Sequence, residues 1–215
     1  MEKGKNKYKT FSIILIILII ILIAFLHLLD KVTGNLKPVL YLYSKESLPV
    51  KVTFSHPEYL TTTYPKYFDK WEVIANKDGS LYDKSGKYYY ALYWEEENSF
   101  VSDFKEGFYV TKENAIDFLE EKLRMIGLND RERNEFIMYW LPILEKNEKS
   151  LVTFKYTDEL QNVNELKIEP KPDSFLRVRM YVKKVHEEVS IQEQKIEPFQ
   201  RSGFTAIEWG GVIVE

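Results

Sequence analysis

The sequence of 215 residues contains no cysteine and only nine glycines. The absence of cysteine excludes disulfide bonds, a lipid-modified cysteine, a thiol nucleophile and a thiolate metal site. The glycines are dispersed and form neither a Walker phosphate-binding motif nor a Rossmann dinucleotide-binding motif. An N-x-[ST] glycosylation sequon is also missing. Nothing in the sequence therefore supports a resident cofactor or metal ion, and we expect none.

Histidine is almost as scarce, with three in the whole chain. Only His56 and His186 lie beyond the apolar run described next, and no G-x-S-x-G nucleophile elbow accompanies them. A Ser-His-Asp arrangement built on one of them stays open. Because His56 precedes a proline in a polar stretch, a solvated surface role is the favoured interpretation there.

One apolar run dominates the N-terminal part of the chain. Of the 19 residues at positions 11–29, 16 are Ile, Leu or Phe, and no residue is charged unless His27 is protonated. As a helix, the run would span about 28 Å, close to the ~30 Å hydrocarbon core of a bilayer. It carries no polar stripe, which a helix at a protein surface would need. The run therefore predicts a transmembrane helix whose partner is the lipid bilayer.

The flanking charges predict the orientation of this helix. Four lysines lie within residues 1–10, whereas one acidic and one basic residue nearly cancel just after the run. The positive-inside rule then gives a cytoplasmic tail at 1–10, a short stalk at 30–37 and an extracytoplasmic domain at 38–215. The alternative is a cleaved signal peptide, but its apolar region usually runs about 7–15 residues. An uncleaved, single-pass signal-anchor in the cell membrane is favoured.

The part outside the membrane is mildly acidic. Beyond residue 30 the chain has 26 basic and 31 acidic side chains, a formal net charge of −5. A nucleic-acid partner would require a basic face, so none is expected. A chain of this length can bury one sizeable core, and one domain is the default. Abundant Lys, Ile, Asn and Tyr fit a bacterial surface protein.

The hydrophobic pattern predicts strands, then two helices, then strands. Thr111 is the expected N-cap of the first helix, whose apolar face includes Ile116, and Gly127 is its left-handed stop. Asn129 is expected to cap the second helix with Glu132 in a capping box, and Pro142 to kink or end it. The fold class is α+β: a mainly antiparallel sheet or sandwich with a pair of packed helices. The expected strands span residues 37–43, 50–54, 71–75, 87–95, 151–156, 166–169, 175–183, 188–191 and 203–209, with a short strand near Leu81 and a loop at 56–65.

The segment 175–183 alternates most clearly. Leu176, Val178 and Met180 alternate with Arg177 and Arg179. Such a pattern is typical of a strand with one face on the core and the other in water.

Seven motifs, in order, resemble a family of proteins from bacteria and some fungi whose opening signature is KPVIYLYP. The motifs here are KPVLYLY at 37–43, TYPK at 63–66, W-x-V at 71–73, YWE at 93–95, YWLP at 139–142, PKPDS at 170–174 and EWGG at 208–211. The chain departs from the family at Ser44, where a proline is usual. The resemblance covers nearly the whole extracytoplasmic part and implies a single domain. It implies no activity, because the family has no established one.

Two glutamates are the candidate catalytic residues. Glu95 and Glu208 each lie beside a tryptophan near the end of an expected strand. Paired carboxylates with aromatic platforms are typical of glycoside hydrolysis and sugar binding. If the two strands are close, both glutamates can meet in a cleft floored by Tyr93 and Phe204, the candidate binding residues. The alternative is that the tryptophans belong to the core and the acids merely rim the sheet.

Two functional classes follow. The first is a membrane-anchored binding or interaction module at the cell surface, with a cell-wall polysaccharide or a protein as partner. The alternative is a carboxylate-dependent, glycosidase-like hydrolase acting on an envelope polymer. The sequence favours the non-enzymatic class but leaves enzymatic activity open.

Overall fold

The computed structural model describes residues 36–97 and 103–214, which form two β-sheets and a pair of helices. The large sheet has eight strands in the order β12-β8-β9-β11-β13-β1-β7-β3 and is mixed, because β11 runs parallel to β13 and β12 parallel to β8. Its strands are β1 (Leu36–Tyr43), β3 (Leu60–Tyr64), β7 (Leu92–Glu96), β8 (Glu106–Thr111), β9 (Lys149–Tyr156), β11 (Ser174–Lys184), β12 (Gln192–Glu193) and β13 (Thr205–Val214).

The small sheet has five antiparallel strands in the order β10-β2-β4-β5-β6. Its strands are β2 (Leu48–Phe54), β4 (Trp71–Ala75), β5 (Leu81–Asp83), β6 (Tyr88–Tyr89) and β10 (Leu166–Glu169). The helical elements are η1 (Pro57–Tyr59), α2 (Ala115–Ile126), α3 (Asp130–Asn147) and α4 (Thr157–Gln161). The α+β class, the two sheets and the helical pair agree with the sequence prediction.

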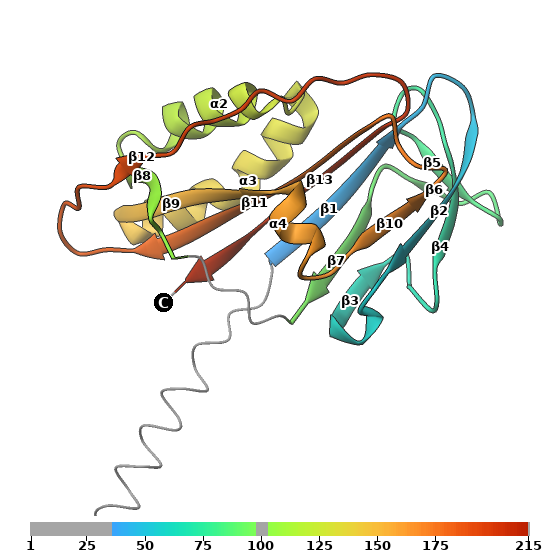
Figure 1. Ribbon diagram of the computed structural model, residues 1–215, viewed down its shortest axis with the longest axis horizontal. Coiled ribbons are helices and arrows are strands. Elements are labelled where there is room, and N and C mark those ends of the chain that lie inside the picture. Colours follow the sequence, from blue (N-terminus) through green and yellow to red (C-terminus); the bar gives the residue numbers. More distant parts are fainter. Residues whose placement is uncertain (1–35, 98–102, 215) are drawn as a thin grey trace, which may run out of the picture.

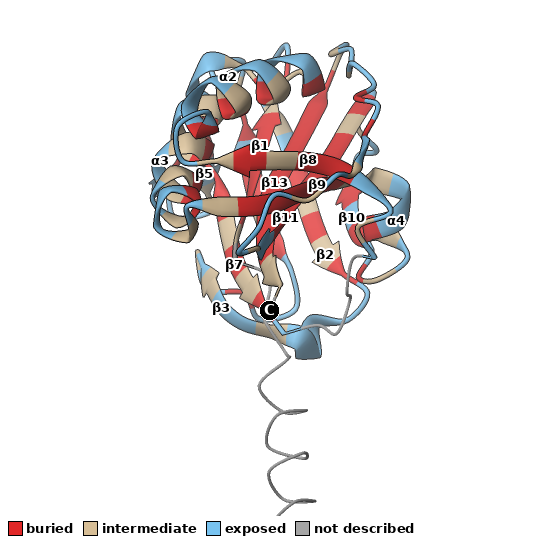
Figure 2. Cartoon of the chain, turned by 90° about the vertical axis from the view of Figure 1, so that its left-hand side faces the viewer, coloured by how far each residue is buried: buried red, intermediate tan, exposed pale blue. Residues whose placement is uncertain are grey.

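The elements stack in three layers (Figure 1). Helices α2 and α3 cover one face of the large sheet, and the small sheet packs on the other face. Each interface has its own apolar core: the helix-side core contains Leu119, Phe136 and Trp209, and the core between the sheets contains Val52 and Trp94. Buried residues consequently run through the middle of the molecule, between the helices and strands β2 and β10 (Figure 2).

The helical pair follows the local signals of the sequence closely. Gly127 ends α2 in the left-handed region, at φ 103°. The Asn129 side chain accepts from the Glu132 backbone N–H, and the Glu132 carboxylate accepts from the Asn129 N–H, which completes the capping box. Two details differ: α2 begins after Asn114 rather than Thr111, and α3 continues through Pro142 to Asn147.

Ile116 was expected on the buried face of α2, but its side chain is 51% exposed. The helix begins three residues later than the predicted cap. Ala115 faces the sheet in place of Ile116, together with the expected Leu119, Leu123 and Ile126, and all four are fully buried.

The predicted wet face of β11 is wrong. Arg177 and Arg179 are each only 1% exposed, and Tyr181 on the same face is fully buried. Alternation of apolar and polar residues usually indicates solvent on the polar side. Here the small sheet and α4 cover that side, and the arginine charges are neutralised internally, as described below.

Several strand assignments also differ from the sequence prediction, and β8 at Glu106–Thr111 was not expected at all. The run 87–95 is not one strand: β6 ends at Tyr89 in the small sheet, and β7 begins at Leu92 in the large sheet. The expected loop at 56–65 contains η1 and β3, and the expected strand at 188–191 is absent, with β12 following at 192–193.

The predicted cytoplasmic tail, the transmembrane segment 11–29 and most of the stalk lie outside the described residues. Within residues 36–97 and 103–214, no helix has the length and apolar character needed to cross a membrane. The last two stalk residues, 36 and 37, belong to β1.

Candidate functional site

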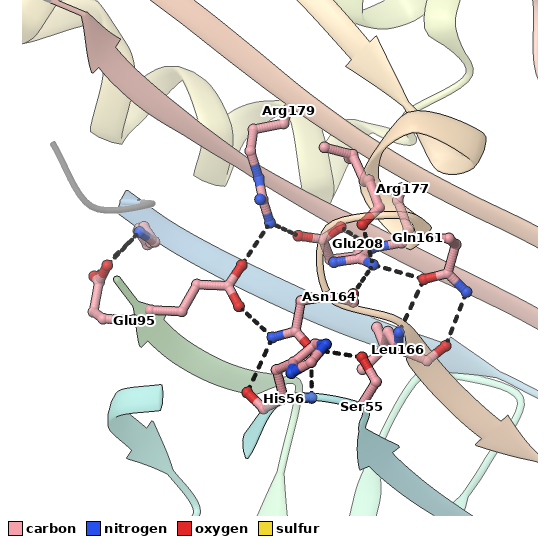
Figure 3. Close-up of polar contacts among 12 residues, drawn as sticks. Ser55, His56, Glu95, Gln161, Asn164, Leu166, Arg177, Arg179 and Glu208 are labelled. Carbon is pink, nitrogen blue, oxygen red and sulfur yellow. Dashed lines mark hydrogen bonds and ion pairs between the residues drawn. The ribbon is translucent and has the colours of Figure 1, made fainter. Parts of the chain in front are cut away.

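Glu208 lies in the interior, between the two sheets, and is fully buried. The parallel register of β11 and β13 places Arg177 opposite it. The Arg177 Nε donates to Glu208 Oε2 at 2.9 Å, and the Arg179 Nη2 donates to Glu208 Oε1 at 3.2 Å (Figure 3). The same Nη2 atom lies 3.3 Å from Glu96 Oε1. Two arginines and two glutamates thus meet in the core and balance one another in charge.

Side chains and carbonyl groups from α4 and the following turn complete this network. The Asn164 Nδ2 donates to Glu96 Oε2 at 2.7 Å, and the Arg177 Nη1 donates to Gln161 Oε1 at 2.6 Å and to the Asn164 carbonyl at 2.7 Å. Burial opposes the charge of Arg179, but the carboxylates of Glu208 and Glu96 outweigh burial and raise its pKa. We call these five residues, Glu96, Asn164, Arg177, Arg179 and Glu208, the buried charge network.

The buried charge network has the properties of a structural element. Its four charged side chains are at most 2% exposed, and their charges sum to zero. A buried ion pair is tolerated when its partners and their remaining hydrogen bonds are satisfied. The network therefore connects β7, β11 and β13 of the large sheet. Asn164 extends it to His56, just after β2 of the small sheet, and Glu208 is shielded from solvent.

Glu95 and Glu208 do not share a face of the large sheet, so the predicted common cleft is wrong. Strand β1 lies between β7 and β13, and Leu40 pairs with Leu92 on one side and with Glu208 on the other. Paired residues share a face, and the faces alternate along a strand. Glu95 follows Leu92 by three residues and so points to the opposite face, as Figure 3 also shows.

The two candidate binding residues, Tyr93 and Phe204, also lie on opposite faces of the large sheet. Tyr93 shares the helix-side face with Glu95, whereas Phe204 is buried in the core between the sheets. Trp94 and Trp209 are both fully buried but belong to different cores. The tryptophans are therefore core residues, as the alternative interpretation held, and the acid beside Trp209 lies in the interior rather than at a rim.

Tyr93 instead lines a hollow at the end of the large sheet. Tyr64 on β3, Tyr93 on β7 and Val39 on β1 pair across three neighbouring strands. The chain passes from the small sheet to the large sheet just beside them, between β6 and β7. This passage adds further tyrosines, and together they enclose a pocket of about 590 Å³. We call it the tyrosine pocket; its lining residues are Lys37, Val39, Tyr64, Tyr88, Tyr89, Tyr90, Ala91 and Tyr93.

The backbone at Lys37 connects the tyrosine pocket to Glu95. Lys37 has a φ of 52° where the pairing of β1 with β13 shifts register. Its N–H donates to both carboxylate oxygens of Glu95 at 3.1 Å, and the Tyr93 hydroxyl donates to Glu95 Oε1 at 2.5 Å. Burial raises the pKa of the Glu95 carboxyl, although these two hydrogen bonds oppose the increase.

Cationic side chains of the protein lie over the pocket tyrosines. The Lys87 Nζ is 5.4 Å from the ring centre of Tyr64 and 5.3 Å from that of Tyr89. The guanidinium of Arg131, on α3, is 4.6 Å from the ring centre of Tyr90. At these distances a cation is attracted to the electron-rich ring face. The tyrosine rings are therefore held in place by neighbours from two layers.

In two other hollows the charged side chains are paired with one another. A groove of about 470 Å³ crosses the outer face of the small sheet, where Lys51 pairs with Glu169 and Lys84 with Glu72. A polar hollow of about 460 Å³ is lined partly by Lys155, which pairs with Glu159. Surface pairs of this kind are mutually satisfied and nearly neutral in energy.

Among residues 36–97 and 103–214, no group of three or more His, Asp or Glu side chains is arranged to hold a metal ion. The His56 ring lies at the surface, with Nδ1 2.9 Å from Glu58 Oε1 and its face stacked on Tyr59. His186 is exposed.

The sequence analysis did not identify Lys37, Lys87 or the pocket tyrosines other than Tyr93. Their signal was the tyrosine run at 88–90, which was assigned to a continuous strand. Their convergence depends on the register shift in β1 and on the passage between sheets, and no local motif encodes either feature.

Neither the family models, the curated proteins nor the solved structures include a match to this chain. The resemblance of the seven motifs to the KPVIYLYP-type family thus stays a prediction.

Proposed function

We propose that this protein is a membrane-anchored module whose extracytoplasmic domain binds cell-wall polysaccharide through the tyrosine pocket. The observation that carries the proposal is the gathering of partly exposed tyrosines around one hollow. Tyr64, Tyr88 and Tyr90 are 54%, 51% and 43% exposed. A soluble domain rarely exposes a group of large rings unless they meet a ligand. The pocket volume lies within the roughly 300–1,000 Å³ range of ligand sites.

The pocket chemistry suits a sugar better than a cationic ligand. The C–H groups of a pyranose ring carry slight positive charge and pack against the electron-rich faces of aromatic rings. Tyrosine hydroxyl groups can in addition exchange hydrogen bonds with sugar hydroxyls. A quaternary ammonium ligand would also seek ring faces, but Lys87 and Arg131 already lie over Tyr64, Tyr89 and Tyr90. These cations would repel it.

The hydrolase alternative has lost its main support. Glycosidases place two carboxyl groups about 5–9.5 Å apart across the scissile bond. Glu208 lies in the buried charge network, on the face opposite to Glu95. Glu95 and Asp83 lie near the tyrosine pocket, but no acidic residue is among the residues lining it. We therefore propose binding without cleavage.

A retention experiment tests this function. The full-length chain, purified in a nonionic detergent, is incubated with insoluble cell-wall polysaccharide, and bound protein and soluble sugar are measured. The wild type is expected to show saturable retention without released sugar. Tyr64→Ala should weaken retention about tenfold, because losing one stacking ring costs up to about 1.5 kcal/mol. Tyr59→Ala is the control, since Tyr59 is an exposed ring at the other end of β3.

Each result discriminates between the functional classes. Release of soluble sugar by the wild type would favour the hydrolase. Absence of retention would overturn polysaccharide binding and leave a protein as the alternative partner. Equal retention of Tyr64→Ala and Tyr59→Ala would place the binding surface elsewhere on the domain.

A protease experiment tests the proposed anchorage. The apolar run at 11–29 and the preceding lysines support an uncleaved anchor with the domain outside the cell. In intact bacterial cells that express the full chain, external protease should digest a C-terminal epitope and spare an N-terminal one. A protected C-terminal epitope would overturn the orientation. A soluble form that begins near residue 35 would instead show cleavage.

A further inference from the structure

Two lysine ammonium groups lie at the tyrosine pocket without a carboxylate partner. Lys37 is one of the residues lining the pocket, and its Nζ is 4.9 Å from the ring centre of Tyr139 and 5.6 Å from that of Trp209. The Lys87 Nζ lies over Tyr64 and Tyr89, which both line the pocket. Neither ammonium forms an ion pair within residues 36–97 and 103–214.

The other cation near the tyrosine pocket is already paired. The Arg131 Nε lies 3.2 Å from Glu135 Oε1, and the second oxygen of that carboxylate accepts from the Tyr41 hydroxyl at 2.7 Å. The lysines of the outer groove, Lys51 and Lys84, likewise have carboxylate partners. Unpaired and positioned ammonium groups therefore distinguish the tyrosine pocket from the groove on the small sheet.

Two carboxylates lie beside these two lysines: Asp83, whose Oδ2 accepts from the Tyr89 hydroxyl at 3.1 Å, and Glu95. Glu95 lies close enough to Lys37 for their charges to interact, but its oxygens accept from the Lys37 N–H and the Tyr93 hydroxyl. Neither acid is among the residues lining the pocket, and Lys87 reaches the pocket only through its position over the lining residues Tyr64 and Tyr89. The surface that a ligand would meet therefore carries positive charge beside aromatic rings.

We infer that the ligand is an acidic polysaccharide whose sugar rings carry carboxylate groups. This inference rests on the proposed function and specifies its ligand class. The tyrosine rings pack against the sugar, and the Lys37 and Lys87 ammonium groups pair with its carboxylates. An ammonium held over an aromatic ring is partly ordered before the ligand arrives, so less side-chain freedom is lost on binding.

A matched pair of probes tests the inference. Titration calorimetry compares tetragalacturonate with its methyl ester, which keeps the sugar rings and removes the charge, on the full-length chain in nonionic detergent. Tetragalacturonate is expected to bind at least about tenfold more tightly than the ester. This preference should shrink as the salt concentration rises, because salt screens exposed charges.

Lysine variants locate the effect. Lys87→Met is expected to weaken tetragalacturonate binding several-fold while leaving ester binding within about twofold, and adding Lys37→Met should abolish the preference for the acid. Methionine keeps much of the aliphatic chain and removes the charge. Lys171→Met is the control, because Lys171 is exposed and lies at the other end of the large sheet from Lys37. Lys171 is close in sequence to Ser174, which pairs with Thr205. Thr205 in turn pairs with Tyr43, at the opposite end of β1 from Lys37. Thermal melting confirms that each variant folds.

Each outcome decides the inference. Equal affinity for acid and ester, in a chain that still binds wall polysaccharide, would overturn the acidic ligand and retain the proposed function. Absence of binding to both probes and to wall polysaccharide would overturn both proposals. Tighter binding of a poly(glycerol phosphate) chain than of tetragalacturonate would show that charge alone is recognised, and this result would overturn the acidic sugar.

Discussion

Glu95 and Glu96 are neighbours in the sequence but belong to two opposite environments. Glu96 is 2% exposed, belongs to the buried charge network, forms an ion pair with Arg179 and accepts a hydrogen bond from Asn164. Glu95 points to the other face of the same strand, beside the tyrosine pocket, and is only partly buried. One step along a β-strand therefore separates a residue that supports the fold from one that adjoins a candidate binding site.

The two environments differ in how their charges are satisfied. In the buried charge network every charged group has an opposite partner, and the network lies between two sheets where a ligand has no access. In the tyrosine pocket Lys37 and Lys87 have ring faces but no carboxylate partner in the described part of the chain. Buried charges that are fully paired favour a structural role, whereas exposed charges without an ion-pair partner favour a role in ligand binding.

Removing a charge from the network should have the largest effect. Glu208→Gln leaves Arg177 and Arg179 in the core with one counter-charge fewer. Breaking a buried ion pair costs about 3–5 kcal/mol of unfolding free energy. Urea denaturation should show this loss, whereas Glu97→Gln, at an exposed position, should change little. A Glu208→Gln variant of unaltered stability would show that the buried charge network does not stabilise the fold.

Removing a neutral member of the network should have a smaller effect. The Asn164 side chain donates to Glu96 and accepts from the His56 backbone N–H at 3.1 Å. Asn164→Ala removes both interactions and leaves buried polar groups with fewer partners. The expected loss is about 1–3 kcal/mol. Asn162→Ala is a suitable control because Asn162 is exposed just after α4. Equal stability of the two variants would contradict the role assigned to Asn164.

Glu95 should have an effect that depends on pH. Burial raises the pKa of its carboxyl, so the folded protein binds this proton more tightly than the unfolded chain does. The contribution of Glu95 to stability should then decline as pH rises from its unfolded pKa, about 4.3, through the raised folded value. Glu95→Gln cannot ionise, so it should gain stability relative to the wild type across this window. Urea denaturation at a series of pH values measures the difference; parallel curves would show that Glu95 is not perturbed.

The sequence predicted the helical pair because its signals are local. The left-handed stop at Gly127 and the capping box of Asn129 and Glu132 each depend on residues within one turn of helix. The α+β class followed from the order of the apolar patterns. These features need no knowledge of which distant segments pack together.

The sequence could not predict features that arise from tertiary pairing. The alternating residues of β11 indicated one wet face, yet another sheet covers it, and Glu208 neutralises Arg177 across a parallel pair of strands. The same limit applies to the candidate site. Whether Glu95 or Glu96 shares a face with Glu208 depends on the register of β1 with two neighbours, which no local pattern encodes. Tyr93 was identified as a candidate and does line the tyrosine pocket, but its binding role stays a prediction.

The smallest effect on stability is expected at Tyr88, and it completes the contrast between the two environments. Tyr88 is half exposed, and its main ring contact is the cross-strand partner Tyr82 at 5.7 Å between ring centres. Such a pair contributes about 0.2–1 kcal/mol, so Tyr88→Ala should unfold at nearly the wild-type urea concentration. Because Tyr88 lines the tyrosine pocket, the same variant should lose retention on wall polysaccharide about tenfold. A large loss of stability, or normal retention by a fully folded Tyr88→Ala protein, would show that Tyr88 supports the fold rather than ligand binding.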